Sequence, residues 1–147
     1  MSTTKPLEGI KVIEISTIIT ASLSAMMLSD QGAEVIKIEQ TGFGDPLRYL
    51  GTQKGGISAI FANTNRGKRS VELDLKIESD LAKAKKLISE ADVLINNFRP
   101  GVMDSLGLGK EDCKTLNKDL IYVAITGFGK EGPVSYTHLR AHETLAY

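Results

Sequence analysis

The sequence has little cysteine, no tryptophan and no excess of charge of either sign. Its 147 residues contain one cysteine, Cys113, so a disulfide framework within the chain and a zinc site built from several cysteines are both excluded. The 18 basic side chains balance the 18 acidic ones, which gives a formal net charge of zero at pH 7. A neutral chain has no overall field to attract a polyanion, and this argues against a dedicated nucleic-acid-binding protein.

Long apolar runs are also missing. No stretch approaches the roughly 20 residues of a transmembrane helix, and residues 1–9 are too polar for a secretory signal. The single cysteine fits a reducing compartment. We therefore expect a cytoplasmic protein with no membrane partner and no nucleic-acid partner. Of its residues, 41% are hydrophobic and 24% are charged, which is typical of one soluble domain.

The first forty residues predict a strand, a helix and a second strand. β-Branched runs at 11–15 and 35–39 favour strands. Between them, apolar residues recur at helical spacing over 22–31, with Ser22 in the place of an N-cap. This order is typical of a parallel βαβ unit. The glycine-rich stretch 41–65 has no sustained period and predicts a long functional loop, with one helical turn near 57–62.

The rest of the chain continues this alternation. Strands are predicted at 70–75, 93–95 and 120–126. An amphipathic pattern predicts a helix over 79–90, and two shorter helical turns follow within 103–117. Together these elements predict an α/β fold with a mostly parallel sheet and flanking helices.

The last fourteen residues, 134–147, differ from the rest. They contain both histidines, His138 and His142, and two of the four tyrosines. The run 135–144 resembles translated sequencing-adapter read-through at the broken end of an assembled gene. We therefore interpret 134–147 as a non-native tail and confine the fold argument to 1–133.

Metal and cysteine chemistry have little support. His138 and His142 have the i, i+4 spacing of metal ligands, but they lack a third ligand and belong to the tail. Cys113 has no histidine outside the tail to activate it, which favours a packing role over a nucleophilic one. We expect neither a metal site nor a cysteine nucleophile.

Residues 127–132 match the pattern Gly-x-Gly-x-x-Gly after a predicted strand. A dinucleotide site needs a helix to start there, whereas Pro133 follows at once. A plain glycine turn is therefore favoured over the alternative, an NAD-dependent dehydrogenase.

Two other clusters suit an anionic ligand. Residues 65–70 (Asn-Arg-Gly-Lys-Arg-Ser) carry three cations in four positions, which suits phosphate groups, although a solvated basic turn is the commoner explanation of such a run. Residues 97–101 (Asn-Phe-Arg-Pro-Gly) follow a predicted strand, at the edge where open α/β sheets bind ligands. There Asn97 suits a hydrogen bond to a base, and Phe98 either stacks on that base or packs into the core.

Six motifs in order carry a more specific signal than any one of them. They lie at 6–14 (Pro-Leu-Glu-Gly-Ile-Lys-Val-Ile-Glu), 32–39 (Gly-Ala-Glu-Val-Ile-Lys-Ile-Glu), 44–48 (Gly-Asp-Pro-Leu-Arg), 65–70, 97–101 and 127–133 (Gly-Phe-Gly-Lys-Glu-Gly-Pro). In this order they resemble the family III CoA-transferases, which include formyl-CoA and carnitine CoA-transferases, with α-methylacyl-CoA racemase as a relative. The resemblance implies a Rossmann-like N-terminal lobe that binds coenzyme A, and a full-length homodimer of interlocked chains.

The resemblance also implies which residues contact coenzyme A. The matching positions lie in the loop after the first strand, at the end of the strand predicted at 70–75, or in the turn at 97–101, and they are Thr17, Thr20, Leu73, Lys76, Asn97, Phe98 and Arg99. Lys68 and Arg69 are candidate phosphate contacts. These residue types agree with the ligand, because its pyrophosphate and 3′-phosphate need cations and N–H donors.

By the same resemblance, the catalytic group is an aspartate downstream of the Gly-Phe-Gly turn, and no residue of this chain matches it. The implied reaction moves coenzyme A from an acyl-CoA thioester to a free carboxylic acid through an acyl–aspartyl anhydride, with no covalently bound cofactor. The racemase relative instead moves a proton with a downstream His and Asp pair. We therefore expect residues 1–133 to be a truncated N-terminal lobe with weak or no CoA binding and no turnover. A non-catalytic CoA- or nucleotide-binding module is the alternative.

Overall fold

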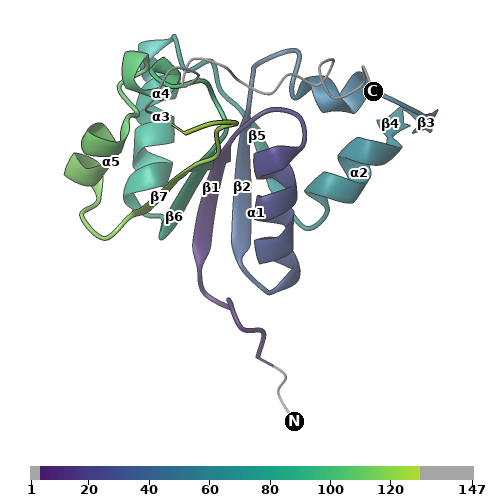
Figure 1. Cartoon of the computed structure of the whole chain (residues 1–147), viewed down its shortest axis with the longest axis horizontal. Helices are drawn as coiled ribbons and strands as arrows, with labels where there is room; N and C mark the ends of the chain where they lie inside the picture. Colours follow the sequence, from purple (N-terminus) through teal and green to yellow (C-terminus); the bar gives the residue numbers. More distant parts are fainter. Residues whose placement is uncertain (1–3, 130–147) are drawn as a thin grey trace.

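Five parallel strands form the centre of the molecule. In the computed structural model, which describes residues 4–129, they lie in the order β5-β2-β1-β6-β7 (Figure 1). Their bounds are β1 Lys11–Ile15, β2 Glu34–Glu39, β5 Arg69–Glu72, β6 Val93–Asn96 and β7 Ile121–Ala124. β5 and β7 are shorter than the strands predicted at 70–75 and 120–126. Every neighbouring pair is parallel, which confirms the predicted α/β fold.

Helices and one hairpin complete the fold. The helices are α1 Thr20–Asp30, α2 Ala59–Asn65, α3 Glu78–Ser89, α4 Val102–Ser105 and α5 Lys110–Leu116, with a 3₁₀ helix, η1, at Pro46–Tyr49. The hairpin pairs β3 (Gln53–Lys54) with β4 (Ile57–Ser58). Within residues 4–129, no helix is long and apolar enough to span a membrane.

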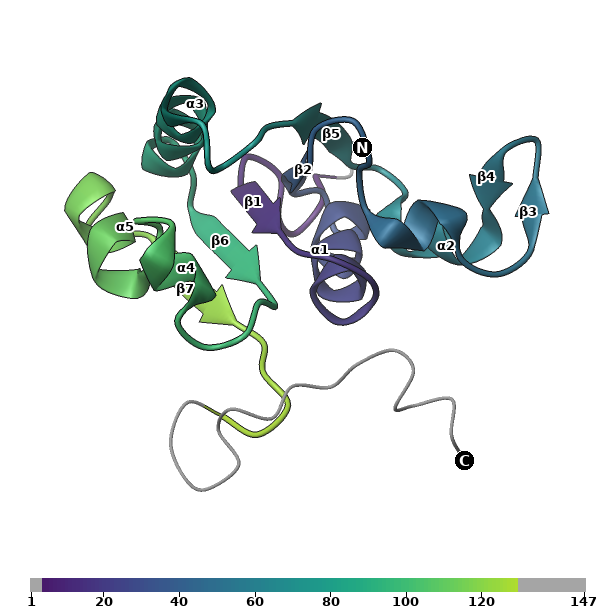
Figure 2. The same ribbon diagram turned by 90° about the horizontal axis from the view of Figure 1, so that it is seen from above.

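One face of the sheet is apolar. Side chains alternate along a strand, so Ile13 and Val12 point to opposite faces. Ile13 packs with Leu94 of β6 and with Ala84 and Ile88 of α3, in a cluster that extends to α5. Figure 2 shows α3 and α5 on this side of the sheet and α1 on the other. The amphipathic pattern over 79–90 therefore predicted both α3 and the face that it buries.

The other face is covered by α1. Ala21 of the helix lies against Val12 and Val35, and its small side chain lets the helix approach the sheet closely. Nearer the carboxyl ends of the strands, this face carries Glu14 of β1 and Lys37 of β2, which are partners in the strand register and are both buried. Charged side chains therefore replace apolar ones at this end of the α1 face.

The start of α1 differs from the prediction. The helix begins at Thr20, and Ile19 occupies the N-cap position, where no side chain of the described residues caps it. Ser22 is therefore not the N-cap: it lies buried inside the first turn, and its hydroxyl donates a hydrogen bond to Glu14 Oε1 (2.9 Å). The sequence pattern is the same for an N-cap serine and for a buried serine in the first turn, because it does not show what the hydroxyl binds.

Residues 41–65 form an arm beside the sheet (Figure 2). The arm contains η1, the β3–β4 hairpin and α2, so it is more ordered than the predicted loop. Asp45 caps η1 by accepting a hydrogen bond from Leu47 N (2.9 Å), and Ser58 caps α2 by accepting one from Phe61 N (3.3 Å). The helical turn predicted near 57–62 lies where α2 begins.

The chain changes direction across the sheet between β1 and β6. β2 and β5 extend the sheet on one side of β1, and β6 and β7 extend it on the other. In an open parallel sheet, such a switch point separates the turns that follow the two central strands and leaves a crevice at their carboxyl ends. Both turns lie at the upper edge of the sheet in Figure 1, which we call the carboxyl edge.

Candidate functional site

The side chain of Asn97 joins the two turns at the switch point. It is buried, and its Oδ1 accepts a hydrogen bond from Thr17 N (3.1 Å) in the turn after β1. Its Nδ2 donates to Thr17 O (2.8 Å) and to Thr20 Oγ1 (3.0 Å). Three of the residues singled out in the sequence are thus in direct contact, although 77 to 80 positions separate Asn97 from the two threonines.

The amino end of α1 faces the same carboxyl edge. The helix starts at Thr20, has no acidic side chain in its first turn and receives no side-chain cap from the described residues. The first N–H groups of a helix have no partner within the helix, and they carry the positive end of its dipole. Near this end the structure therefore presents N–H donors and the Thr20 hydroxyl.

The turn between β1 and α1 contains a strained residue. Ile18 has a φ of +66°, a left-handed conformation that a β-branched side chain rarely adopts. Such a residue costs on the order of 1–3 kcal/mol and persists only where its surroundings hold it. Here Ile18 N donates a hydrogen bond to Asp45 Oδ1 (3.0 Å), a residue of the arm that is 1% exposed. Nothing in the sequence pattern indicated this contact.

Four buried charges lie beneath this turn, and we call them the ion cluster: Glu14, Lys37, Asp45 and Lys68. Lys37 Nζ lies 2.6 Å from Glu14 Oε1 and 2.9 Å from Asp45 Oδ2, and Lys68 Nζ lies 2.7 Å from Glu14 Oε2. All four side chains are at most 2% exposed. Burial alone would raise the pKa of Glu14, but the two ammonium groups hold that pKa below its usual range.

The position of Lys68 corrects its interpretation as a phosphate contact. Besides Glu14, its ammonium donates hydrogen bonds to Ser22 O (2.7 Å) and Asn65 Oδ1 (2.9 Å). An ammonium has three protons, and all three are used by these partners. Burial lowers the pKa of Lys68, and the nearby Glu14 carboxylate opposes that shift. Lys68 is therefore an internal counter-charge.

Arg69 also lies away from the carboxyl edge. It opens β5 opposite Ile36 in the strand register, and its guanidinium pairs with Glu34 at the amino end of β2. The third cation of the 65–70 cluster, Arg66, pairs with Asp30 at the far end of α1 (2.5 Å). All three cations thus face carboxylates of this chain, and these pairs connect β5 and α2 to the rest of the fold.

A second buried carboxylate fixes the arm to the sheet. Glu39 of β2 accepts two hydrogen bonds from the Arg48 guanidinium (2.8 and 2.7 Å), one from the Ser70 hydroxyl (2.6 Å) and one from Asp45 N (2.8 Å). Burial acts to raise the pKa of Glu39, but these donors outweigh it and lower the pKa to about 2. The Arg48 guanidinium also stacks over the Phe61 ring at 4.0 Å. These contacts attach the arm to β2 next to Asp45.

The two candidate residues after β5 lie at the carboxyl edge, with β2 between them and β1. Leu73 is buried in the apolar cluster, and its N–H donates to Glu39 O (3.0 Å). Lys76 is exposed, and its N–H donates to Asp74 Oδ1 (3.0 Å). The Lys76 ammonium is thus open to solvent, whereas the Leu73 side chain belongs to the core.

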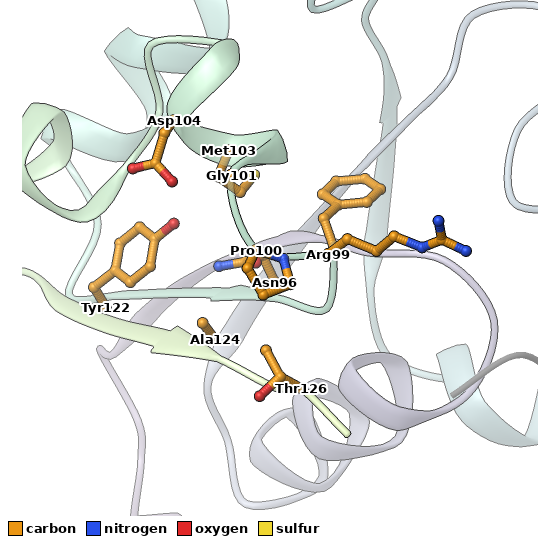
Figure 3. Close-up of a pocket in the computed structure, with 10 residues that line it drawn as sticks. Asn96, Arg99, Pro100, Gly101, Met103, Asp104, Tyr122, Ala124 and Thr126 are labelled. Carbon is orange, nitrogen blue, oxygen red and sulfur yellow. The ribbon is translucent and has the colours of Figure 1, made fainter. Parts of the chain in front are cut away.

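The turn after β6 places Phe98 and Arg99 differently. Phe98 is half-buried and packs against the apolar cluster, while Arg99 is exposed, and its guanidinium points away from Tyr122 and Asp104 in Figure 3. Ten residues line a hollow of about 20 Å³ there, which is room for about one water molecule: Asn96, Phe98, Arg99, Pro100, Gly101, Met103, Asp104, Tyr122, Ala124 and Thr126. A nucleotide does not fit inside it, so a ligand at this edge would lie on the surface.

Cys113 and Tyr122 are both protonated at neutral pH. Burial, with a smaller contribution from Asp112, raises the pKa of the Cys113 thiol to about 11. Burial likewise raises the pKa of Tyr122 to about 12, and its hydroxyl donates to Leu108 O (3.3 Å). Among residues 4–129, no three His, Cys, Asp or Glu side chains are grouped as metal ligands.

The interpretations of the tail, of its two histidines and of most of the glycine motif at 127–132 lie outside the described residues. Only the first three positions of that motif are described, and there Gly129 N donates a hydrogen bond to Thr126 Oγ1 (3.0 Å).

Sequence comparisons with known proteins point to one family. A sequence model of the family described as CoA-transferase family III matches residues 7–146. Acetyl-CoA:oxalate CoA-transferase of Acetobacter aceti is 41% identical over 140 residues, which are 95% of this chain and 36% of that protein. The human succinyl-CoA:glutarate CoA-transferase is 37% identical over 136 residues, which are 92% of this chain and 31% of that protein.

A solved structure shows the same likeness in three dimensions. A CAIB/BAIF family protein from Brucella suis superposes with a TM-score of 0.87 at 39% identity, covering 92% of this chain and 37% of that one. The chain spans about a third of the length of the curated relatives that it matches.

Proposed function

This chain belongs to CoA-transferase family III, and on that basis we propose that its carboxyl edge binds the coenzyme A part of an acyl-CoA. We propose further that the full-length protein moves coenzyme A from an acyl-CoA thioester to a free carboxylic acid. The names of two relatives support this, since each pairs a CoA thioester with a dicarboxylic acid: acetyl-CoA with oxalate, and succinyl-CoA with glutarate.

One observation carries the binding proposal: the Asn97 side chain joins the turn at 97–101 to Thr17 and Thr20, next to the amino end of α1. Coenzyme A carries a pyrophosphate and a 3′-phosphate, and helix N–H groups and cations both bind phosphate. Lys76 and Arg99 are exposed at this edge, and neither pairs with a carboxylate of the described residues. This contrasts with Arg66, Lys68 and Arg69, which are paired.

The proposed reaction follows from the chemistry of a thioester. An aspartate carboxylate attacks the acyl carbon, the C–S bond breaks, and an acyl–aspartyl anhydride and CoA thiolate result. The thiolate then attacks the aspartyl carbonyl of the anhydride, which releases the donor acid and leaves an aspartyl–CoA thioester. The acceptor carboxylate attacks that thioester and frees the thiolate, and the thiolate attacks the acyl carbon of the new anhydride, which forms the new acyl-CoA and restores the aspartate. By resemblance, that aspartate lies downstream of the turn that starts at Gly127. We therefore propose that residues 1–133 bind coenzyme A weakly and supply no catalytic carboxylate, and that the full-length enzyme is a cytoplasmic homodimer of interlocked chains.

The binding proposal is tested with matched arginine variants of the 147-residue chain. Arg99→Ala is expected to weaken CoA binding roughly tenfold, because a charge-assisted contact to phosphate is lost. Arg69→Ala serves as the control, since Arg69 lies at the amino end of the sheet, and its CoA affinity should match the wild type. Equal affinities for all three proteins would overturn the assignment of Arg99. Loss of binding in a Gly129 variant alone would favour a dinucleotide site instead.

The absence of a catalytic carboxylate is tested by assay. The purified chain is expected to show no exchange of coenzyme A between acetyl-CoA and oxalate, and measurable turnover would contradict the proposal. The boundary at residue 133 is tested separately by sequencing genomic DNA past that codon. An open frame with a Gly-Asp segment there would support both the family's aspartate and the non-native origin of residues 134–147.

A further inference from the structure

Two contacts hold the turn between β1 and α1, one on each side. Asn97 bonds both backbone groups of Thr17, at 3.1 Å to the nitrogen and 2.8 Å to the oxygen. Asp45 bonds the next residue, accepting from Ile18 N at 3.0 Å. Ile18 is the only non-glycine residue among 4–129 with a positive φ, so the second contact holds a strained backbone position.

The position of Asp45 is set by the sheet and not by the turn that it contacts. Its backbone N–H donates to Glu39 Oε2 (2.8 Å), and its Oδ2 lies 2.9 Å from Lys37 Nζ, so two β2 side chains hold it. Its Oδ1 also accepts from Leu47 N (2.9 Å). Asp45 is 1% exposed. These contacts hold its carboxylate in place independently of the hydrogen bond from Ile18.

We infer that Asp45 is a positioning residue for coenzyme A binding: it holds Ile18 in the left-handed conformation and thereby sets Thr17 and Thr20 against Asn97. The arm is then part of the binding site although it need not touch the ligand. This inference rests on the proposed function, because the turn has no other assigned ligand. Without Asp45, Ile18 would return to the negative φ that a β-branched residue favours. The peptide would then turn away from the arm, and the positions of Thr17 and Thr20 would change.

The test compares Asp45→Ala with Asp30→Ala in the 147-residue chain. Asp30 is the matched control, an exposed aspartate paired with Arg66 at the opposite end of α1. A strong NOE between the N–H and Hα of Ile18 reports its positive φ, and CoA titration reports binding. Asp45→Ala should lose the NOE and bind coenzyme A about tenfold more weakly, while Asp30→Ala keeps both.

Rescue separates positioning from general damage to the fold. Glycine adopts a positive φ without steric cost, so Asp45→Ala combined with Ile18→Gly should recover most of the CoA affinity. A merely structural role for Asp45 predicts no recovery. An Asp45→Ala protein that stays folded and keeps both the NOE and the affinity would overturn the inference.

Two further results keep the inference distinct from the proposed function. If Asp45→Ala does not fold, Ile18→Gly should melt at a higher temperature than Ile18→Ala, and the reverse order would overturn the inference. If the wild type shows the NOE but no CoA binding at 10 mM, the proposed function fails, and the NOE in Asp45→Ala still decides whether Asp45 holds the turn.

Discussion

The two faces of the sheet carry different kinds of side chain. The face under α3 and α5 is filled by branched apolar side chains such as Ile13, Leu94 and Ile88. The face under α1 carries Val12, Val35 and Ile95, which pack on alanines of the helix, and it carries the ion cluster toward the carboxyl ends of the strands. Apolar packing is non-directional, whereas buried charges require particular partners at particular distances. Both faces therefore contribute stability, and the charged face in addition fixes the geometry of the carboxyl edge.

The largest effect is expected on the charged face. Glu14→Gln leaves Lys37 and Lys68 with one buried carboxylate between them, which should lower the free energy of unfolding by about 3–5 kcal/mol. Urea unfolding measures it, with Glu90→Gln, an exposed acid at the end of α3, as the control. A loss below about 1 kcal/mol, typical of a surface pair, would mean that the cluster does not set the geometry of this face.

A slightly smaller effect is expected on the apolar face. Leu94 is fully buried, and Leu94→Ala should cost about 3 kcal/mol through lost burial and a residual cavity. The two faces should differ in their influence on binding, because the CoA affinity of the folded fraction should be unchanged in Leu94→Ala. An affinity that falls with stability in this variant would break the proposed separation between the two faces.

Acid should weaken the charged face first. The pKa of Glu39 is about 2 in the fold, below its usual 4.5, so its contribution is complete above about pH 4.5 and is lost as the pH falls toward 2. The free energy of unfolding of Glu39→Gln should therefore fall less than that of the wild type between pH 5 and pH 2, by on the order of 1–2 kcal/mol after allowance for solvent screening at Arg48. Glu8→Gln, at an exposed acid, should follow the wild-type curve, and an identical curve for Glu39→Gln would contradict the assignment.

The smallest effect is expected at the amino end of the sheet. Arg69 and Glu34 form an exposed pair, so Arg69→Ala should cost less than about 1 kcal/mol. Thermal unfolding measures this, and Lys68→Met, which removes a buried cation one residue away, should cost several times more. Equal losses of stability in the two variants would show that Lys68 and Arg69 do not differ in role.

The sequence predicted strands and helices well because their patterns are local. The β-branched runs of β1 and β2 and the apolar spacing of α3 each lie within a dozen residues. The turn at 97–101 was also found, because it follows a strand and carries a distinctive motif. Its contact with Thr17 was not predicted, because the resemblance placed each residue near coenzyme A without relating one to the other.

The ion cluster was missed because its burial depends on register. Glu14 and Lys37 each look like the exposed position of an alternating strand, yet the pairing of β1 with β2 brings them together. Opposite charges at equivalent positions of two neighbouring apolar strands were the available signal. No such signal exists for Asp45 and Ile18, which lie 27 positions apart in two irregular segments.

The central claim is that the carboxyl edge at β1 and β6 binds coenzyme A, and a titration followed residue by residue tests it most directly. Amide ¹H–¹⁵N spectra of the 147-residue chain, recorded up to 10 mM coenzyme A, should show shifts concentrated at residues 17–20, 73–76 and 97–101. The amides around Arg66 and Arg69 should stay in place. Shifts centred on residues 65–70, or no shifts at all at 10 mM, would contradict the account.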